Sequence, residues 1–181
     1  MSNRRTNRAW VFDDTGVPRA DYSKQHLIPL LNWMFRPGHD DALVTIDGAR
    51  YGIAICKDLD FPSLARGYAQ RGAQALLVPA LDLGLDGPWH ARMAVLRGVE
   101  QGLSVIRSAN DGIMSISDAH GRMLAQTPSG RASIATLTAR APLGSGPTPY
   151  GRIGDLFGWA CVTLTALVLL WRYCTRASHP R

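Results

Sequence analysis

The chain has 181 residues, of which 46% are hydrophobic and 19% are charged. This length and composition predict one globular domain of ordinary size and exclude a disordered polyelectrolyte. The formal net charge of +6 comes from scattered arginines, with no basic run interleaved with aromatic residues, so we expect no nucleic-acid partner. Three cysteines far apart in sequence, Cys56, Cys161 and Cys174, exclude a disulfide scaffold.

The N-terminal part of the chain carries strand and turn signals. Apolar residues at Trp10–Phe12 predict a short strand, and the Asp-Asp-Thr-Gly sequence at 13–16 predicts a tight turn. Residues 42–46 and 51–55 predict two further strands. The Asp47-Gly48 pair between them is typical of a two-residue hairpin turn.

Helices and strands then alternate. The sequence Phe61-Pro62-Ser63 predicts a helix start, the helix continues through residues 64–70, and Gly72 closes it. A short buried strand is predicted at 75–78, stopped by Pro79.

Helical spacing continues at residues 89–100, with apolar side chains predicted on one face: Met93, Leu96, Val99 and Leu103. The remaining elements are strands at 103–107, 113–116 and 132–138, with turns at 110–112 and 118–122. Hairpins mixed among strand–helix alternations favour a layered α/β domain with a mixed sheet over a purely parallel one.

The C-terminal segment differs in composition. Residues 141–152 are rich in Pro and Gly and are interpreted as a linker after a domain at 1–140. Residues 153–173 are predicted to form one transmembrane helix, because no charged residue lies between Leu156 and Trp171; a buried core helix is the alternative.

Membrane topology follows from the basic tail at 174–181. The positive-inside rule predicts that this tail is cytoplasmic and that the globular part lies on the periplasmic side of the inner membrane. The N-terminal residues carry no export signal. We therefore expect that an upstream membrane segment is missing from this sequence.

Cys56 is the strongest candidate for chemistry. It directly follows an apolar strand and enters a turn, so its sulfur is expected at the edge of the sheet, where backbone N–H groups can stabilise an oxyanion. A nearby lysine would favour the nucleophilic thiolate. The alternative is that Cys56 is a small buried hydrophobic residue.

The other ionisable residues give weaker signals. The chain has two lysines, Lys24 and Lys57, and one glutamate, Glu100. A solvated surface lysine and a helix-surface charge are the ordinary alternatives for Lys24 and Glu100. No metal-ligand spacing and no phosphate-binding glycine loop occurs, so we expect neither metal nor cofactor.

Several segments, in order, resemble the nitrilase (carbon–nitrogen hydrolase) superfamily, and most closely the C-terminal part of the apolipoprotein N-acyltransferases. The segments that carry the resemblance are Tyr22–Pro29 (YSKQHLIP), Arg36–Gly38, Gly52–Pro62 (GIAICKDLDFP), Ala91–Glu100, Arg107–Gly112, Ser117–Gly121 and Thr148–Asp155. The resemblance implies an α/β/β/α sandwich, partial here because the N-terminal strands are missing, followed by one transmembrane helix.

The resemblance also implies a mechanism. In that family a Glu-Lys-Cys triad forms a thioester, which here makes Cys56 the nucleophile and Lys24 the oxyanion stabiliser. Asp58, Glu100 and Asn110 are candidate supporting residues. The sequence departs from the family, because no glutamate precedes Lys24 and Asp58 stands where the acyltransferases have a glutamate. Another family glutamate corresponds to Asn32.

Three functions remain open. The first is transfer of a fatty acyl group from a phospholipid, through the Cys56 thioester, to the N-terminal amine of a lipoprotein. Such a fragment is expected to have little activity unless a separately encoded N-terminal half supplies the glutamate. The second is hydrolysis of a small amide, and the third is a catalytically inactive, membrane-anchored interaction module.

Overall fold

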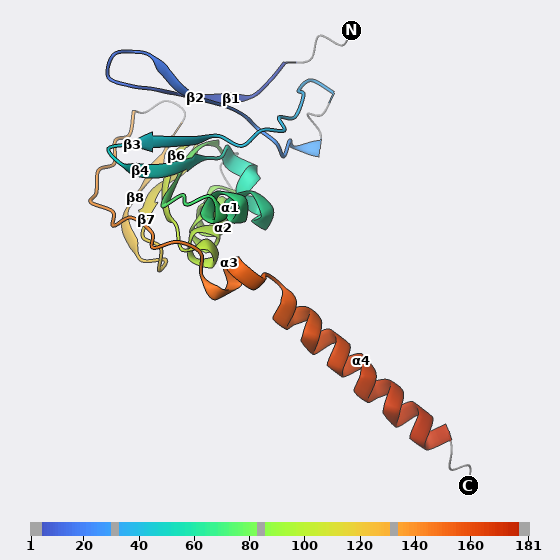
Figure 1. The fold of residues 1–181 in the computed structure, drawn as a ribbon. Helices are drawn as coiled ribbons and strands as arrows, with labels where there is room; N and C mark the ends of the chain where they lie inside the picture. The colour runs from blue at the N-terminus through green and yellow to red at the C-terminus, as the bar shows by residue number, and fades with distance from the viewer. Residues whose placement is uncertain (1–4, 30–32, 83–85, 131–133, 178–181) are drawn as a thin grey trace. The chain divides into compact units, whose positions relative to one another are not determined.

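The computed structural model describes residues 5–29, 33–82, 86–130 and 134–177. It divides into two compact units, residues 1–151 and residues 152–181. The first unit contains an α/β domain, and the second contains a long apolar helix (Figure 1).

A six-stranded mixed sheet forms the centre of the first unit, in the order β3-β4-β5-β6-β7-β8. Its three central strands are parallel and its outer pairs are antiparallel, which confirms the predicted mixed sheet. The strands are β3 (Leu43–Ile46), β4 (Ala49–Ile53), β5 (Ala75–Leu81), β6 (Ser104–Asn110), β7 (Gly112–Ser117) and β8 (Met123–Ser129).

The hairpin that joins β3 to β4 has the predicted turn. Asp47 and Gly48 both have positive φ, 48° and 78°, as a two-residue hairpin turn of this hand requires. Ile46 pairs with Ala49 across the turn. From this turn β4 runs to Ile53, and Cys56 follows three residues later, just beyond the carboxyl end of the strand.

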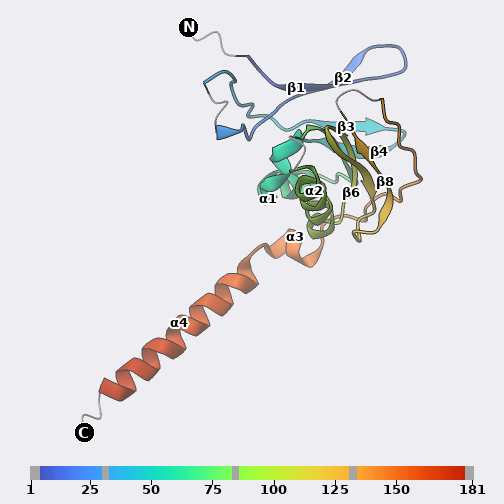
Figure 2. The ribbon, with the colours of Figure 1, turned by 180° about the vertical axis from the view of Figure 1, so that it is seen from behind.

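Two helices, α1 (Pro62–Gln70) and α2 (Gly87–Gln101), cover one face of the sheet (Figures 1 and 2). Tyr68 of α1 lies so close to Gly52 that a Cβ there would be 2.6 Å from the ring, and its hydroxyl donates to the Ile53 carbonyl at 2.5 Å. A Cβ on Gly98 of α2 would be 2.7 Å from Val105. Small residues thus allow both helices to approach the sheet closely.

The buried face of α2 differs from the predicted one. Leu96 and Val99 are exposed, whereas the residues that α2 buries are Gly87, Ala91, Ala94, Arg97, Gly98 and Gln101. The prediction was wrong because it followed the large apolar side chains. The close approach of α2 to β6 leaves room on the buried side mainly for small ones.

A separate antiparallel hairpin, β1 (Arg8–Phe12) with β2 (Pro18–Ser23), packs against the core. Ala9, Val11 and Ala20 contact the buried cluster, and Tyr22 is fully buried. Trp10 therefore faces outward, where its ring stacks on the exposed ring of Phe12 in the same strand. The hairpin leads directly into the segment that carries Lys24.

Two strand predictions need correction. Pro79 does not end β5. The Leu77 carbonyl, two residues earlier, accepts from Ala54 just after β4, so the nitrogen of Pro79 faces the same side of the strand. Because β4 has ended before this point, the proline costs no sheet hydrogen bond. The last strand is β8 at Met123–Ser129. Residues 134–138 are irregular, and 132–133 lie outside the described residues.

The stretch interpreted as a linker is attached to the domain. Ser104 donates to the Pro142 carbonyl, Gly144 N–H donates to the Gln74 carbonyl, and the short helix α3 (Pro149–Ile153) follows. Residues 141–151 are therefore part of the first unit rather than a free linker. The helix of the second unit, α4, spans Leu156–Ala177.

Candidate active site

Cys56 lies where the chain leaves β4 and enters a 3-10 helix, η2 (Cys56–Asp60). Its φ is +49°, a conformation that costs a non-glycine residue about 1–2 kcal/mol. The side chain is partly exposed, and its thiol lies 3.7 Å from the Leu81 carbonyl oxygen, to which it donates. A strained, accessible cysteine at the end of a central strand has the placement that nucleophilic catalysis needs.

Asp58, two residues later, ties this turn to the hairpin segment. Its fully buried carboxylate accepts hydrogen bonds from the Tyr22 hydroxyl at 2.7 Å, the His26 N–H at 2.8 Å and the Ile55 N–H at 3.0 Å. Burial, and then the Asp58 charge, raise the pKa of Tyr22, so this hydroxyl stays a donor. The His26 ring also stacks on Phe61 at 3.9 Å.

In the sequence Lys24 lies midway between Tyr22 and His26, which both donate to Asp58, and it is 5% exposed. Its N–H donates to the Asn7 carbonyl, and its carbonyl accepts from Gly38 N–H, both at 2.8 Å. Gly38 is required here, because a Cβ would lie 2.2 Å from the Ser23 carbonyl oxygen. Lys24 also lines a small cavity of about 40 Å³. These contacts hold the backbone of Lys24 in place. Asp58 connects the segment that carries Lys24 to the turn that begins at Cys56.

The second lysine has a different partner. The Lys57 ammonium lies 2.9 Å from Asp60, and this hydrogen bond is the main cause that raises the pKa of Lys57. Lys57 is partly exposed. It follows Cys56 directly, but its ammonium is engaged with its own turn.

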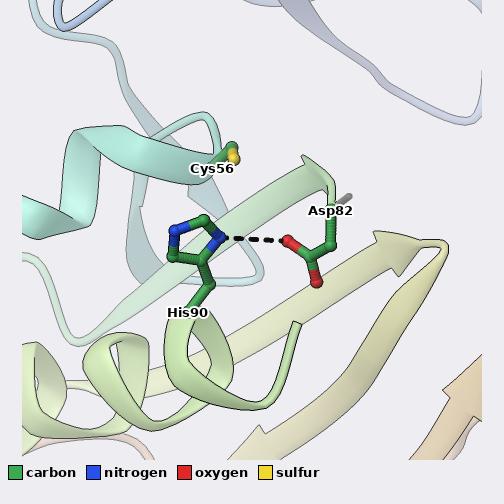
Figure 3. Close-up of side chains that lie close together, drawn as sticks. All are labelled: Cys56, Asp82 and His90. Carbon is green, nitrogen blue, oxygen red and sulfur yellow. Dashed lines mark hydrogen bonds and ion pairs between the residues drawn. The ribbon is translucent and has the colours of Figure 1, made fainter. Parts of the chain in front are cut away.

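A cluster that the sequence analysis missed lies beside Cys56 (Figure 3). Asp82 follows β5 and His90 lies in the first turns of α2; one ligand atom of each lies within 4.8 Å of the others and of the Cys56 sulfur. His90 Nδ1 is 3.4 Å from Asp82 Oδ1. Cys56 and Asp82 come together because they follow neighbouring parallel strands, whose carboxyl ends meet at one edge of the sheet, and the sequence alone does not show that these strands pair.

Arg107 on β6 binds the Asp82 side chain of this cluster. Its guanidinium donates to Asp82 Oδ1 at 2.6 Å and to the Ile113 carbonyl at 2.7 Å, and both charged side chains are buried. Cysteine, histidine and aspartate are ligand types for a metal ion. Asp82 Oδ1, however, already accepts from a guanidinium, so the geometry favours a hydrogen-bonded relay over a cation site.

The structure places the other two candidate supporting residues differently, with Asn110 next to the cluster and Glu100 away from it. Glu100 is paired with Arg97 near the end of α2, and ten residues of helix place it about 15 Å along the axis from His90. Asn110 is exposed at the end of β6, where it pairs with Leu81 and its carbonyl accepts from the Asp82 N–H at 2.9 Å; it also lines a hollow with Ser129. Asn32 lies outside the described residues.

Removing the Asp58 carboxylate is expected to destabilise the domain. In Asp58→Ala three donors lose their acceptor, and we expect the free energy of unfolding to fall by about 3 kcal/mol or more. Asp60→Ala, which removes only the half-exposed partner of Lys57, should change it by less than about 1 kcal/mol. Urea titration of the full chain in detergent measures both. Equal losses would contradict the tethering role of Asp58.

Comparison with known proteins places this geometry in a family. A model described as carbon-nitrogen hydrolase matches residues 2–144. The chain belongs to the carbon-nitrogen hydrolase family. This confirms the resemblance inferred from the motifs around Lys24 and Cys56.

Curated relatives of this carbon-nitrogen hydrolase include acyltransferases. The chain is 32% identical over 174 residues to an apolipoprotein N-acyltransferase of Geobacter metallireducens, and 29% identical over 201 residues to that of Bradyrhizobium diazoefficiens. The alignments cover 90% and 98% of this chain but 33% and 37% of the relatives. The chain therefore spans about a third of their length.

Solved structures support the nitrilase-like fold. An amidase of Nesterenkonia AN1 matches with a TM-score of 0.63 and 25% identity, over 67% of this chain and 50% of the amidase. Nit3 of Saccharomyces cerevisiae, a nitrilase-superfamily member, matches with a TM-score of 0.65 and 24% identity, over 69% and 50%. Another structure of the amidase carries acrylamide added covalently at its active-site cysteine.

Proposed function

We propose that this chain is the C-terminal part of an N-acyltransferase, in which Cys56 takes a fatty acyl group from a phospholipid and passes it to the N-terminal amine of a lipoprotein. The observation that carries the proposal is an exposed apolar helix, Leu156–Thr175, following a carbon-nitrogen hydrolase domain. An enzyme that draws acyl chains from a bilayer needs such an anchor, and a soluble amidase does not. The names of the curated relatives support the same choice.

The proposed reaction consists of two displacements at one acyl carbon. The thiol of Cys56 loses its proton, its sulfur bonds to the ester carbon, and the C–O bond breaks as the leaving alkoxide takes up a proton. The amine of the lipoprotein then attacks the thioester and the C–S bond breaks. The proton lost by the amine restores the thiol. Each step passes through an oxyanion.

Lys24 is proposed to stabilise that oxyanion. Its burial supports this role, because an ammonium acts more strongly on developing charge when water is excluded. The connection through Asp58 supports it as well, since the same carboxylate binds residues on both sides of Lys24 and the turn that starts at Cys56.

The membrane anchor is part of the proposal. The 20 residues of Leu156–Thr175 have a mean hydropathy of 1.5 and none of the segment is buried; at 1.5 Å per residue they reach about 30 Å, the thickness of a hydrocarbon core. Arg172 lies in the last turn of this segment and Arg176 follows it, whereas Asp155 precedes it. The proposed orientation therefore places the C-terminus in the cytoplasm and the domain in the periplasm of a bacterial inner membrane.

The proposed partners include the source of a triad glutamate. Glu100 is the one glutamate in the sequence, and it is paired with Arg97. We propose that the family's general base comes from an N-terminal region equivalent to the part of the relatives that this chain does not cover.

Hydrolysis of a small amide is the second candidate, favoured by the likeness to the Nesterenkonia AN1 amidase. One experiment separates the two. The full chain in mixed phospholipid–detergent micelles is given a phospholipid with a labelled acyl chain, together with a peptide that begins with diacylglyceryl-cysteine. In parallel it is given short aliphatic amides.

The acyltransferase proposal expects labelled N-acyl peptide by mass spectrometry and no ammonia from the amides. Ammonia without acyl peptide would replace it with the amidase candidate. If neither product forms, even with the N-terminal region of a relative added, both proposals are contradicted and an interaction module is left.

A further inference from the structure

We infer that Arg97 and Glu100 of α2 position the nucleophile. Arg97 binds the end of η2 and thereby holds Cys56, the first residue of η2, in the conformation that the reaction needs. The inference rests on the proposed role of Cys56 as the nucleophile. Neither charged group is assigned a contact with substrate, so both are positioning residues rather than catalytic ones.

Arg97 connects α2 to the turn that carries the cysteine. Its Nε donates to the Leu59 carbonyl at 3.0 Å, and the two residues are only 7% and 2% exposed. Leu59 is the fourth of the five residues of η2, which begins at Cys56. The last carbonyls of a helix have no partner within the helix, so a donor from a neighbouring element determines where they lie. Arg97 is such a donor for η2.

Cys56 is the residue of this turn that most needs support from its surroundings. Its φ of +49° is unfavourable for a residue with a Cβ, and such a conformation persists only where neighbouring contacts hold it. Asp58 supplies one of these contacts, because its carboxylate binds the backbone N–H just before the cysteine. Arg97 supplies another at Leu59, after the cysteine. The backbone is therefore held on both sides of the sulfur.

Two further contacts orient the guanidinium of Arg97. Its Nη1 is paired with Glu100, three residues later in α2, and its Nη2 donates to Met93 Sδ at 3.4 Å, four residues earlier. Residues with these spacings share one face of a helix. The guanidinium is thus held between two side chains of its own helix, with Nε directed at the Leu59 carbonyl.

The energetics of the pair also point to positioning. A largely buried ion pair adds little net stability, because taking both charges out of water costs about as much as their attraction returns. Apolar side chains at Arg97 and Glu100 would stabilise the domain equally well. They would lack the donor that binds η2.

Urea titration of the full chain in detergent separates positioning from folding. Arg97→Met alone leaves the Glu100 carboxylate without its cation, so the midpoint of unfolding should fall by about 1 M or more. In the double variant Arg97→Met, Glu100→Leu, both charges are replaced by apolar side chains. Its midpoint should stay within about 0.5 M of the parent, although the bond to Leu59 is lost.

A fluorine label on Cys56 reports the conformation of the turn without any acyl transfer. The parent is the full chain with Cys161→Ser and Cys174→Ser, alkylated with bromotrifluoroacetone. Its fluorine NMR spectrum should show one narrow line. In the double variant we expect this line to split or to broaden by at least about 2-fold, because the turn then exchanges between conformations.

Ser104→Ala is the matched control for the label. It loses a hydrogen bond from a buried hydroxyl to the Pro142 carbonyl at the amino end of β6, whereas Cys56 follows the carboxyl end of β4. The midpoint of urea unfolding should fall in this variant, and the fluorine line should stay as narrow as in the parent. Destabilisation alone is then excluded as the cause of a changed line.

Thioester formation provides the second readout. With the N-terminal region of a relative supplied, the double variant should acylate Cys56 about 10²-fold more slowly than the unlabelled parent, which is the cost of a reacting group displaced by about 1 Å. The phospholipid concentration at half-maximal rate should not change, because neither substituted residue is assigned a contact with substrate.

Four results would overturn the inference. These are a fluorine line in the double variant identical to that of the parent, the same change of line in Ser104→Ala, a urea midpoint of the double variant as low as that of Arg97→Met, and thioester formation in the double variant at the parent rate. A changed line in the double variant, together with no thioester in the parent, would support the positioning role and contradict only the proposed function.

Discussion

Replacing Cys56 by alanine is expected to abolish release of lysophospholipid from phospholipid micelles. The wild-type chain, supplied with the N-terminal region of a relative, should release up to one equivalent, since without an acceptor the acyl group stays on the sulfur. Cys56→Ala has no atom that can take the acyl group, so release should fall to the rate of a blank without protein. Chromatography of the lipid extract over time measures both.

The other two cysteines provide the matched control for this variant. Cys161 and Cys174 lie in α4, where both are exposed. The double variant Cys161→Ser, Cys174→Ser should release lysophospholipid like the wild type. Loss of release in that variant, with release retained in Cys56→Ala, would assign the nucleophile to the membrane helix and contradict the proposed active site.

Replacing Lys24 by methionine is expected to slow thioester formation by about 10²–10³-fold, the usual cost of losing one group that stabilises an oxyanion. Methionine keeps most of the side-chain length and apolar contact and removes the charge. Because the substituted group acts on the transition state, the single-turnover rate should fall while the phospholipid concentration at half-maximal rate changes little.

Lys57→Met is the comparison for this prediction. Its ammonium is partly exposed and bound to Asp60, so the rate should change by less than about 5-fold. Urea titration of both variants shows whether the buried position tolerates methionine. A Lys24 variant that is folded and as fast as wild type would remove Lys24 from the mechanism.

Local signals predicted the parts of the fold in which neighbouring residues decide the structure. The Asp47-Gly48 turn has the positive φ values that its sequence requires, and Pro62 starts α1 as expected. The turn at Cys56 was predicted from its position after an apolar strand. In each case a short run of residues determines the backbone, and distant contacts only reinforce it.

Tertiary packing decided the parts that sequence could not predict. Pro79 stays inside β5 because of where β4 ends, which is a property of the sheet. Leu96 lies outside because α2 approaches β6 through Gly98. Residues 134–138 have an apolar alternation but pair with no strand in the described part of the chain, whereas β8 pairs with β7 through a short turn.

The candidate site was predicted only in part for the same reason. Cys56 and Lys24 stand out as a strand-end cysteine and a lysine in a family motif. Asp82 and His90 carry no spacing signal, since one follows a strand and the other opens a helix eight residues later. The parallel pairing of β4 with β5 brings them to the sulfur, and pairing of this kind is not visible in a single sequence.

Mass spectrometry of the peptide that contains Cys56 tests the account most directly. The full chain, supplied with the N-terminal region of a relative, is incubated with a phospholipid of defined acyl chain, quenched in acid and digested. We predict that the Cys56 peptide gains the mass of that acyl group and loses it on treatment with neutral hydroxylamine. A Cys56 peptide of unchanged mass, from protein in which iodoacetamide shows the thiol to be free and reactive, would contradict the central claim that this cysteine accepts a fatty acyl chain.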